Sequence, residues 1–261
     1  RAVVEDHFNE LVIDLVNPAG QPERMQLVVR GYNDGFAFCY KIPDGKGPCV
    51  NVQSELTAYN FAGDYTAWFY NGENHNIGPE KLTETDGTRL PVMTVKAGDK
   101  HYMAIHEACL ETGAPLVLQS KGGESLFSVA SKPTSLSPGY TSAWRVVLYG
   151  TTPGVLTDSH LLELLNPDPD SRYDFSWVKP GLAVWDWRIN GAVWDGFTYG
   201  MSYPSWVRMV DFAAEQGFKY LVLDANWYGP EFESDSDPVK GEKAQDVQRL
   251  LKYGKEKGVG I

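Results

Sequence analysis

The sequence predicts a mixed fold, in which an antiparallel β region is followed by the beginning of a parallel α/β region. Short runs of alternating apolar and polar residues, separated by Gly- and Pro-containing turns, occupy the chain up to about residue 166. A Pro-rich acidic segment follows at 166–171, and beyond it longer apolar runs alternate with segments of helical periodicity. We therefore expect two domains, 1–166 and 182–261, joined by a linker over 167–181.

The β region contains strand-like runs at the spacing of a β-sandwich, namely 10–15, 25–30, 35–40, 91–95, 102–106 and 144–149. The turn signal at 43–47 lies between the runs 36–41 and 49–53, which predicts a hairpin with Cys39 opposite Cys49. Both cysteines fall on the more polar faces of these runs, so free thiols are favoured and a disulfide is the alternative. Residues 158–165 are expected to form a short helix capped by Asp158 or Ser159.

The second region has the order β-α-β-α-β. Strands are expected at 182–187, 219–224 and from 259 onward, and helices at 204–216 and 245–257. Pro204 is suited to the first turn of a helix and Gly217 to its end. The second helix should bury Val247, Leu250, Leu251 and Gly254.

Two and a half strand–helix units cannot close a barrel. The chain also begins at Arg1 without a Met and ends at Ile261. We therefore expect it to be a fragment of a longer protein.

Composition excludes some classes of function. The 261 residues include 34 acidic and 23 basic side chains, so the formal charge of −11 argues against nucleic acid as the main partner. No apolar run approaches the roughly 20 residues that span a bilayer. The 8 Trp and 14 Tyr suit the stacking of sugars, although β-rich domains favour aromatic residues in any case.

Candidate binding residues lie where the two strands of the α/β region end, since ligands of such folds bind at the carboxyl ends of the strands. The first end carries Trp185, Asp186 and Trp187, and the second carries Asp224, Asn226 and Trp227. Core packing is the alternative role for Trp185. Asp224 follows an apolar run, so its carboxylate must be solvated or hydrogen-bonded.

Glu107 is the candidate metal ligand in the β region. It follows His106 at the end of a strand-like run, where a carboxylate could bind a hard cation through oxygen. A solvated carboxylate at the rim of the sheet is the alternative. The sequence contains no phosphate-binding glycine loop, GxSxG elbow or HExxH helix.

Several motifs, in the same order along the chain, resemble glycoside hydrolase family 97. In the second region these are WVKPG at 177–181, VWDW at 184–187, DFAAE at 211–215 and LDANWY at 223–228. In the β region they are NEL at 9–11, YNDGFAF at 32–38, DYTAW at 64–68 and WRV at 144–146.

The resemblance implies an exo-acting α-glycosidase, either an α-galactosidase or an α-glucosidase, with a calcium ion at its catalytic site. It implies that 1–166 is the later part of a β-super-sandwich and that 182–261 is the first two to two-and-a-half βα units of a (β/α)₈ barrel. The rest of the same enzyme is then a partner, and the catalytic carboxylates lie beyond residue 261.

The resemblance also implies roles for single residues. Glu107 matches the glutamate that helps to ligate calcium, although His106 and Cys109 depart from the family pattern. The six residues at the strand ends would bind the sugar of an oligosaccharide or a polysaccharide-derived α-glycoside. The LDAxWY motif is more similar to the retaining, α-galactosidase-containing branch than to the inverting α-glucosidase branch.

The family further implies a periplasmic or secreted location. Two alternatives to the enzyme stay open. One is a non-catalytic carbohydrate-binding β-sandwich module formed by 1–166, and the other is an inactive member of the family.

Overall fold

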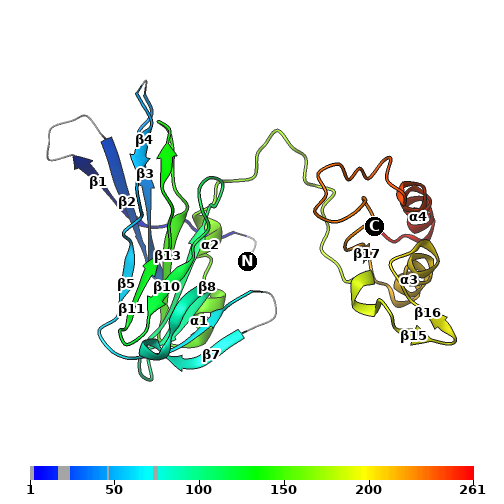
Figure 1. The fold of residues 1–261 in the computed structure, drawn as a ribbon, viewed down its shortest axis with the longest axis horizontal. Coiled ribbons are helices and arrows are strands. Elements are labelled where there is room, and N and C mark those ends of the chain that lie inside the picture. Colours follow the sequence, from blue (N-terminus) through cyan, green and yellow to red (C-terminus); the bar gives the residue numbers. More distant parts are fainter. Residues whose placement is uncertain (1–2, 17–23, 46, 73–75) are drawn as a thin grey trace. The chain divides into compact units, whose positions relative to one another are not determined.

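The structure is a computed structural model that describes residues 3–16, 24–45, 47–72 and 76–261 (Figure 1). It divides into two compact units, Arg1–Pro169 and Asp170–Ile261. The division falls inside the segment 167–181, while the end points given for the linker remain a prediction. Among the described residues, no helix is long and apolar enough to cross a membrane.

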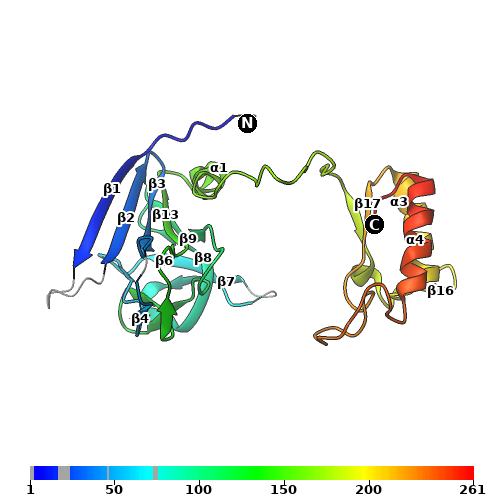
Figure 2. The same ribbon diagram turned by 90° about the horizontal axis from the view of Figure 1, so that it is seen from above.

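The first unit is an antiparallel β structure. Its described residues form an 11-stranded sheet in the order β1-β2-β3-β13-β9-β8-β10-β11-β5, with β6 and β7 paired beside β8, and a two-stranded sheet of β12 and β4 (Figure 2). The strands are β1 (Asn9–Val16), β2 (Arg24–Tyr32), β3 (Gly35–Lys41), β4 (Val50–Val52), β5 (Ala58–Asn60), β6 (Thr66–Tyr70), β7 (Asn76–Lys81), β8 (Asp86–Lys96), β9 (Tyr102–Ala108), β10 (Leu118–Lys121), β11 (Leu126–Val129), β12 (Thr134–Leu136) and β13 (Trp144–Gly150). The strands expected at 10–15, 25–30, 35–40, 91–95, 102–106 and 144–149 are confirmed.

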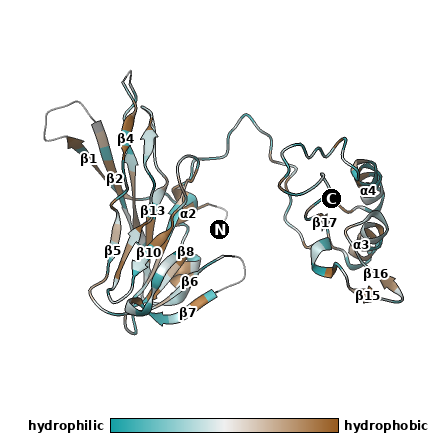
Figure 3. Ribbon diagram, in the orientation of Figure 1, coloured by the Kyte–Doolittle hydropathy of each residue, from teal (hydrophilic) through white to brown (hydrophobic). Residues whose placement is uncertain are grey.

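Successive residues of a strand point to opposite faces of the sheet. Apolar residues occur along many of the strands of the first unit (Figure 3). On β9, Ile105 joins an apolar core with Phe69, Met93 and Phe127. The neighbouring Ala104 joins a second core, which includes Val146, Leu148 and Leu161. The sheet is therefore covered by apolar side chains on both faces, as in a sandwich.

The prediction of a hairpin between 36–41 and 49–53 is wrong. β3 pairs with β2 on one side and with β13 on the other, so neither of its edges is free for β4, which pairs with β12. The turn at Asn33 and Asp34 joins β2 to β3 directly, and such a short loop closes at lower entropic cost than the segment 42–49 would. Lys46 of the expected turn lies outside the described residues.

The cysteines show the consequence of this pairing. Cys39 lies opposite Val28 rather than opposite Cys49, and it is buried in the sheet, whereas Cys49 is exposed. All three cysteines fall in described parts of the chain, and all are free thiols.

The helix expected over 158–165 is two short helices, α1 (Pro153–Asp158) and α2 (Leu161–Leu164). Ser159 separates them. Its hydroxyl donates to Asp34 Oδ2 at 2.6 Å and accepts from the backbone N–H of Leu161 at 3.2 Å. Ser159 therefore serves as an oxygen acceptor at the start of α2 and ties this segment to the β2–β3 turn.

The second unit has the predicted β-α-β-α-β order, and β14 pairs with β17 in parallel. Its elements are β14 (Ala183–Trp185), the 3₁₀ helix η2 (Asp186–Ile189), β15 (Val193–Trp194), β16 (Phe197–Thr198), α3 (Tyr203–Gln216), β17 (Tyr220–Val222) and α4 (Ala244–Lys257). A parallel bridge between Tyr220 and Gly260 begins the third strand. β14 is shorter than expected because the chain turns into η2 at Asp186.

The two helices of this unit are positioned by their ends and by their apolar faces. Pro204 lies in the first turn of α3, and Gly217 ends that helix with φ +72°, in the left-handed region that favours glycine. Trp206 of α3 and Leu250 of α4 are fully buried in one core with Leu221 of β17. Leu251, expected in this core, is instead 49% exposed, because the buried stripe of α4 follows Val247, Leu250 and Gly254.

Candidate functional site

The parallel pairing of β14 and β17 brings the first of the predicted strand ends beside the second. Trp185 is the last residue of β14 and lies in register with Val222, the last residue of β17. Asp224 follows two residues later, and Asp186 opens η2. The two carboxylates therefore occupy the same edge of the small parallel sheet, where ligands of α/β folds bind.

Asp186 is buried, with 1% of its surface exposed. Its Oδ2 accepts a hydrogen bond from Trp206 Nε1 at 2.9 Å, and its Oδ1 accepts one from the backbone N–H of Asp224 at 3.0 Å. Both oxygens are thus used in holding the ends of the two strands and α3 together. The direct partners of Asp186 are protein groups, and it fixes the backbone of Asp224.

Trp185 and Trp187 are exposed, and the half-buried Asp224 lies beside them. The two indole rings stack with centroids 5.6 Å apart, and the Arg188 guanidinium lies 5.0 and 5.2 Å from their centroids. Trp185 Nε1 donates to Asp224 Oδ2 at 2.7 Å. This geometry combines an aromatic surface with a carboxylate at its edge, which is the chemistry of a sugar-binding wall.

Asn226 and Trp227 lie at the start of the loop that follows Asp224. Asn226 has φ +63°, and its Oδ1 accepts from the backbone N–H of Glu231 at 3.1 Å. Trp227 packs against the core of the unit and meets Tyr228 edge to face, with 5.3 Å between the ring centroids. Trp227 is thus partly a core residue, while Asn226 shapes the loop.

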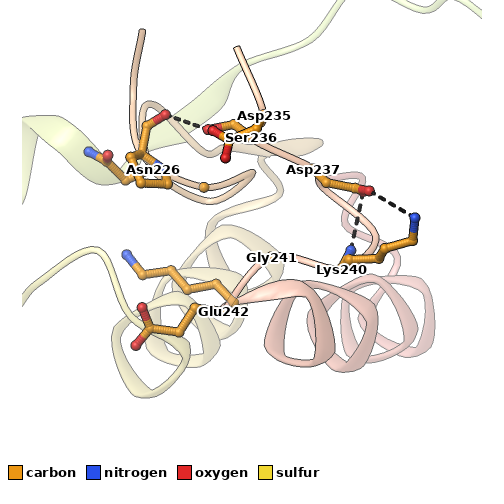
Figure 4. Close-up of a pocket in the computed structure, with 10 residues that line it drawn as sticks. Asn226, Asp235, Ser236, Asp237, Lys240, Gly241 and Glu242 are labelled. Carbon is orange, nitrogen blue, oxygen red and sulfur yellow. Dashed lines mark hydrogen bonds and ion pairs between the residues drawn. The ribbon is translucent and has the colours of Figure 1, made fainter. Parts of the chain in front are cut away.

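The same loop encloses a hollow of about 530 Å³ (Figure 4). Its lining mixes acidic, basic and polar groups, among them Asn226, Asp235, Ser236, Asp237, Lys240, Glu242 and Lys243. Figure 4 shows that several are engaged locally: Asp237 accepts from the backbone N–H of Lys240 and pairs with its ammonium group, and Ser236 donates to the Pro230 carbonyl. The hollow is open, and Asn226, Ser236 and Asp237 make hydrogen bonds within the loop itself.

Glu107 belongs to the first unit, near the end of β9. Its Oε2 accepts from the backbone N–H of Leu116 at 2.8 Å and from Arg145 Nη1 at 3.2 Å. The neighbouring His106 Nδ1 accepts the backbone N–H of Glu107 at 2.8 Å, and burial lowers the pKa of His106. His106 Nδ1 therefore acts as an acceptor that supports the backbone of Glu107.

Glu55 and Arg145 form the part of this site that sequence analysis missed. Arg145 Nε and Nη2 donate to the two carboxylate oxygens of Glu55, at 3.0 and 2.7 Å, while Nη1 donates to Glu107. Burial acts to lower the pKa of Arg145, but the hydrogen bonds and charges of the two glutamates outweigh it and raise that pKa. An arginine inside the apolar run 144–148 was the available signal, since such a charge requires a partner.

The donor chemistry around Glu107 fits one ligand of a calcium ion and no more. Calcium takes six to eight oxygen ligands. Within the described ranges, no group of three or more His, Cys, Asp or Glu side chains is arranged to hold a metal. Glu107 Oε1 accepts no hydrogen bond from a described residue, so this oxygen is available.

Comparison with known families covers nearly the whole chain. Residues 1–167 match the family model described as Glycosyl-hydrolase 97 N-terminal, and residues 184–261 match the model Glycoside hydrolase 97. A retaining alpha-galactosidase of Bacteroides thetaiotaomicron is 28% identical over an alignment of 275 positions. The alignment covers 89% of this chain and 40% of the relative. A probable retaining alpha-galactosidase of Streptomyces bingchenggensis is 30% identical over 258 residues, covering 91% and 37%.

Solved structures of family 97 enzymes also resemble this chain. A Glycoside Hydrolase Family 97 enzyme from Pseudoalteromonas sp. strain K8, in complex with acarbose, superposes with a TM-score of 0.76 at 25% identity, over 98% of this chain and 42% of that one. A variant of that enzyme in complex with panose gives a TM-score of 0.77 at the same identity and coverage. The chain thus spans about two-fifths of the length of the relatives that it matches.

Proposed function

Because the chain belongs to glycoside hydrolase family 97, we propose that it works as part of a longer, exo-acting α-glycosidase. The observation that carries the proposal is the match of both family models in order, over 1–167 and 184–261. The fold agrees, since an antiparallel sandwich is followed by parallel βα units. In this proposal the described units supply the sandwich and the first strands of a (β/α)₈ barrel.

Terminal α-galactosides are the substrates we favour, with α-glucosides as the second choice. Both curated relatives carry the name retaining alpha-galactosidase. The enzyme from Pseudoalteromonas was solved with acarbose and with panose, so the family also includes members that bind such oligosaccharides. The LDAxWY motif at 223–228 supports the galactosidase branch.

The chemistry requires two carboxyl groups, about 5 Å apart for a retaining nucleophile or about 6.5–9.5 Å apart for inversion. We place both of them beyond residue 261. In this chain, Trp185 and Trp187 would stack on the sugar ring. Asp224 would accept a sugar hydroxyl at Oδ1, because Oδ2 is engaged by Trp185. Asn226 and Trp227 would shape the adjoining wall, and Asp186 would hold Asp224 in place.

Calcium is part of the proposal through Glu107. Its free Oε1 would be one ligand, and the remaining ligands would come from outside the described residues. When bound, the ion would supply a Lewis acid for polarising the leaving-group oxygen. We also propose the periplasmic or secreted location that the family implies, which cell fractionation would test.

The test is nitrophenol release from the α-galactoside and from the α-glucoside, measured with the complete enzyme in the presence of calcium. We expect release from the galactoside in preference to the glucoside, and slower release for Asp224→Asn. Asp235→Asn is the matched control, because Asp235 is an exposed acid on the loop that follows. No release from either sugar would contradict the proposal and favour a carbohydrate-binding module or an inactive family member.

A further inference from the structure

Arg145 has an unusual position for a charged residue. It lies within β13, between apolar neighbours, and it is 5% exposed. It stands directly opposite Glu107 on β9 in the antiparallel register. A cross-strand pair of opposite charge on a central strand is therefore built into the sheet itself, and the backbone ladder fixes its geometry.

Glu55 holds the guanidinium from the other side. Both of its oxygens accept from Arg145, and its own backbone N–H donates to Ser131 Oγ at 2.8 Å. The fork-to-fork contact fixes the plane of the guanidinium, because two parallel hydrogen bonds leave it little freedom to rotate. The third donor, Nη1, then points to Glu107.

The two carboxylate oxygens of Glu107 differ in their contacts. Arg145 and the Leu116 N–H both donate to Oε2, so the rotation of the carboxylate is fixed and Oε1 is left without a described donor. The formal charges of Glu55, Arg145 and Glu107 sum to −1 + 1 − 1 = −1. The cluster thus keeps one negative charge, and the cation of Arg145 does not cancel the attraction of Glu107 for a metal ion.

We propose that Arg145, held by Glu55, is a positioning residue that orients Glu107 and leaves its Oε1 free to bind the divalent cation. This inference rests on the proposed calcium role of Glu107. In metal sites generally, partners that orient a ligand contribute strongly to affinity, and their loss weakens binding about 10–100-fold. Arg145 and Glu55 act here through Glu107 and do not touch the metal or the sugar.

The experiment is calorimetric titration of calcium into the complete enzyme after treatment with a chelator. The variants are Glu55→Asp, which keeps the charge but is one methylene too short for the paired contact, and Arg145→Lys, which keeps the charge but lacks the planar fork that contacts both glutamates. We expect calcium to bind about 10–100-fold more weakly to each. The rise in Tm that calcium produces in the wild type should shrink in parallel.

Arg89→Lys is the matched control. Arg89 pairs with Glu80 at 3.4 Å in the same unit, and that ion pair is also largely buried but does not include Glu107. Its substitution should leave the affinity for calcium unchanged. Near-ultraviolet circular dichroism checks that each variant is folded, and Glu55→Asp gives the answer if Arg145→Lys does not fold.

The possible failures are distinguishable. If Glu107→Gln weakens calcium binding while Glu55→Asp and Arg145→Lys lower only the Tm, then Arg145 is merely structural and the positioning role is overturned. In that case the calcium part of the proposed function survives. If the wild type itself binds no calcium, both the calcium role and the positioning role are overturned.

Discussion

At the scale of single residues, the three thiols differ in burial, and this difference predicts the order in which they react. Burial raises the pKa of Cys39 to about 11 and also raises the pKa of Cys109, whereas Cys49 is exposed. Since the thiolate is the reactive form, iodoacetamide at neutral pH should modify Cys49 first and Cys39 last. Time-resolved alkylation followed by peptide mass spectrometry would measure the order.

Two controls complete this experiment. In denaturant, all three thiols should react at similar rates, because burial is lost. A disulfide between Cys39 and Cys49 would give a different result, with neither residue modified until a reductant is added. That outcome would contradict the strand pairing described for β3.

Asp186 gives a second prediction at this scale. Asp186→Ala would leave two donors, the buried Trp206 Nε1 and the part-buried Asp224 N–H, without an acceptor. Each unsatisfied buried donor costs about 1–3 kcal/mol, so we expect the free energy of unfolding to fall by about 2–6 kcal/mol. Urea denaturation followed by Trp fluorescence would measure it, with the exposed Asp235→Ala as the control.

A second variant, Asp186→Asn, distinguishes two roles for Asp186. If it positions Asp224, Asp186→Asn in the complete enzyme should lower both stability and turnover. If instead it binds the sugar directly, as its sequence position suggested, KM should rise while the Tm stays unchanged. Sequence could place Asp186 at a strand end, but it could not show that Trp206, twenty residues later on α3, occupies its carboxylate.

At the scale of elements, the contact between α3 and α4 should depend on pH. Asp211 of α3 accepts from the Tyr253 hydroxyl at 2.6 Å and pairs with Lys257 of α4 at 2.9 Å. The Tyr253 hydrogen bond, supplemented by Lys257, lowers the pKa of Asp211 below its ordinary value. The contribution to stability is therefore complete above the unfolded pKa of about 3.9 and is lost as the pH falls through the lower, folded value.

Thermal unfolding between about pH 6 and about pH 3 would measure this effect. Asp211→Asn should lower the Tm at the upper end of the range and reduce the fall in Tm toward acid. Asp246→Asn makes the same change of charge on α4, at a residue that contacts Arg249 rather than α3, so it is the matched control. An identical fall for wild type and Asp211→Asn would contradict the prediction.

Elements differed in how far the sequence could determine them. The limits of α3 followed from local signals, Pro204 at its start and Gly217 at its end. The pairing of β3 could not be predicted in this way, because the turn signal at 43–47 is local. One of the two partners of β3 is β13, which lies more than a hundred residues away. Non-local pairing is decided by the whole sheet, which no short window of sequence describes.

At the scale of the whole molecule, the family was recognisable because its motifs are spread over both units in a fixed order. The cluster of Glu55, Arg145 and Glu107 was not recognisable from the sequence, because its members lie far apart along the chain. Two of them, Arg145 and Glu107, are brought together only by the register of β9 and β13. Sequence thus predicted the architecture and the residues at the strand ends, while the contacts that orient Glu107 required the three-dimensional structure.

The connection between the two units gives the last prediction. Residues 171–181 are exposed, and the structure assigns them to no helix or strand. Tyr173, Phe175 and Trp177 are 63%, 50% and 75% exposed, so chymotrypsin should cut here early, as it should at Phe232, which is 94% exposed in the loop between β17 and α4. Intact-mass spectrometry at short digestion times should show two products, each with a mass close to that of one unit, while buried aromatic residues such as Phe69 and Trp206 stay protected.

Replacing all three aromatic residues of this segment with Ser should slow that cleavage without changing the Tm. First cuts within β13 or α3 would instead mean that 167–181 is not the boundary between the domains.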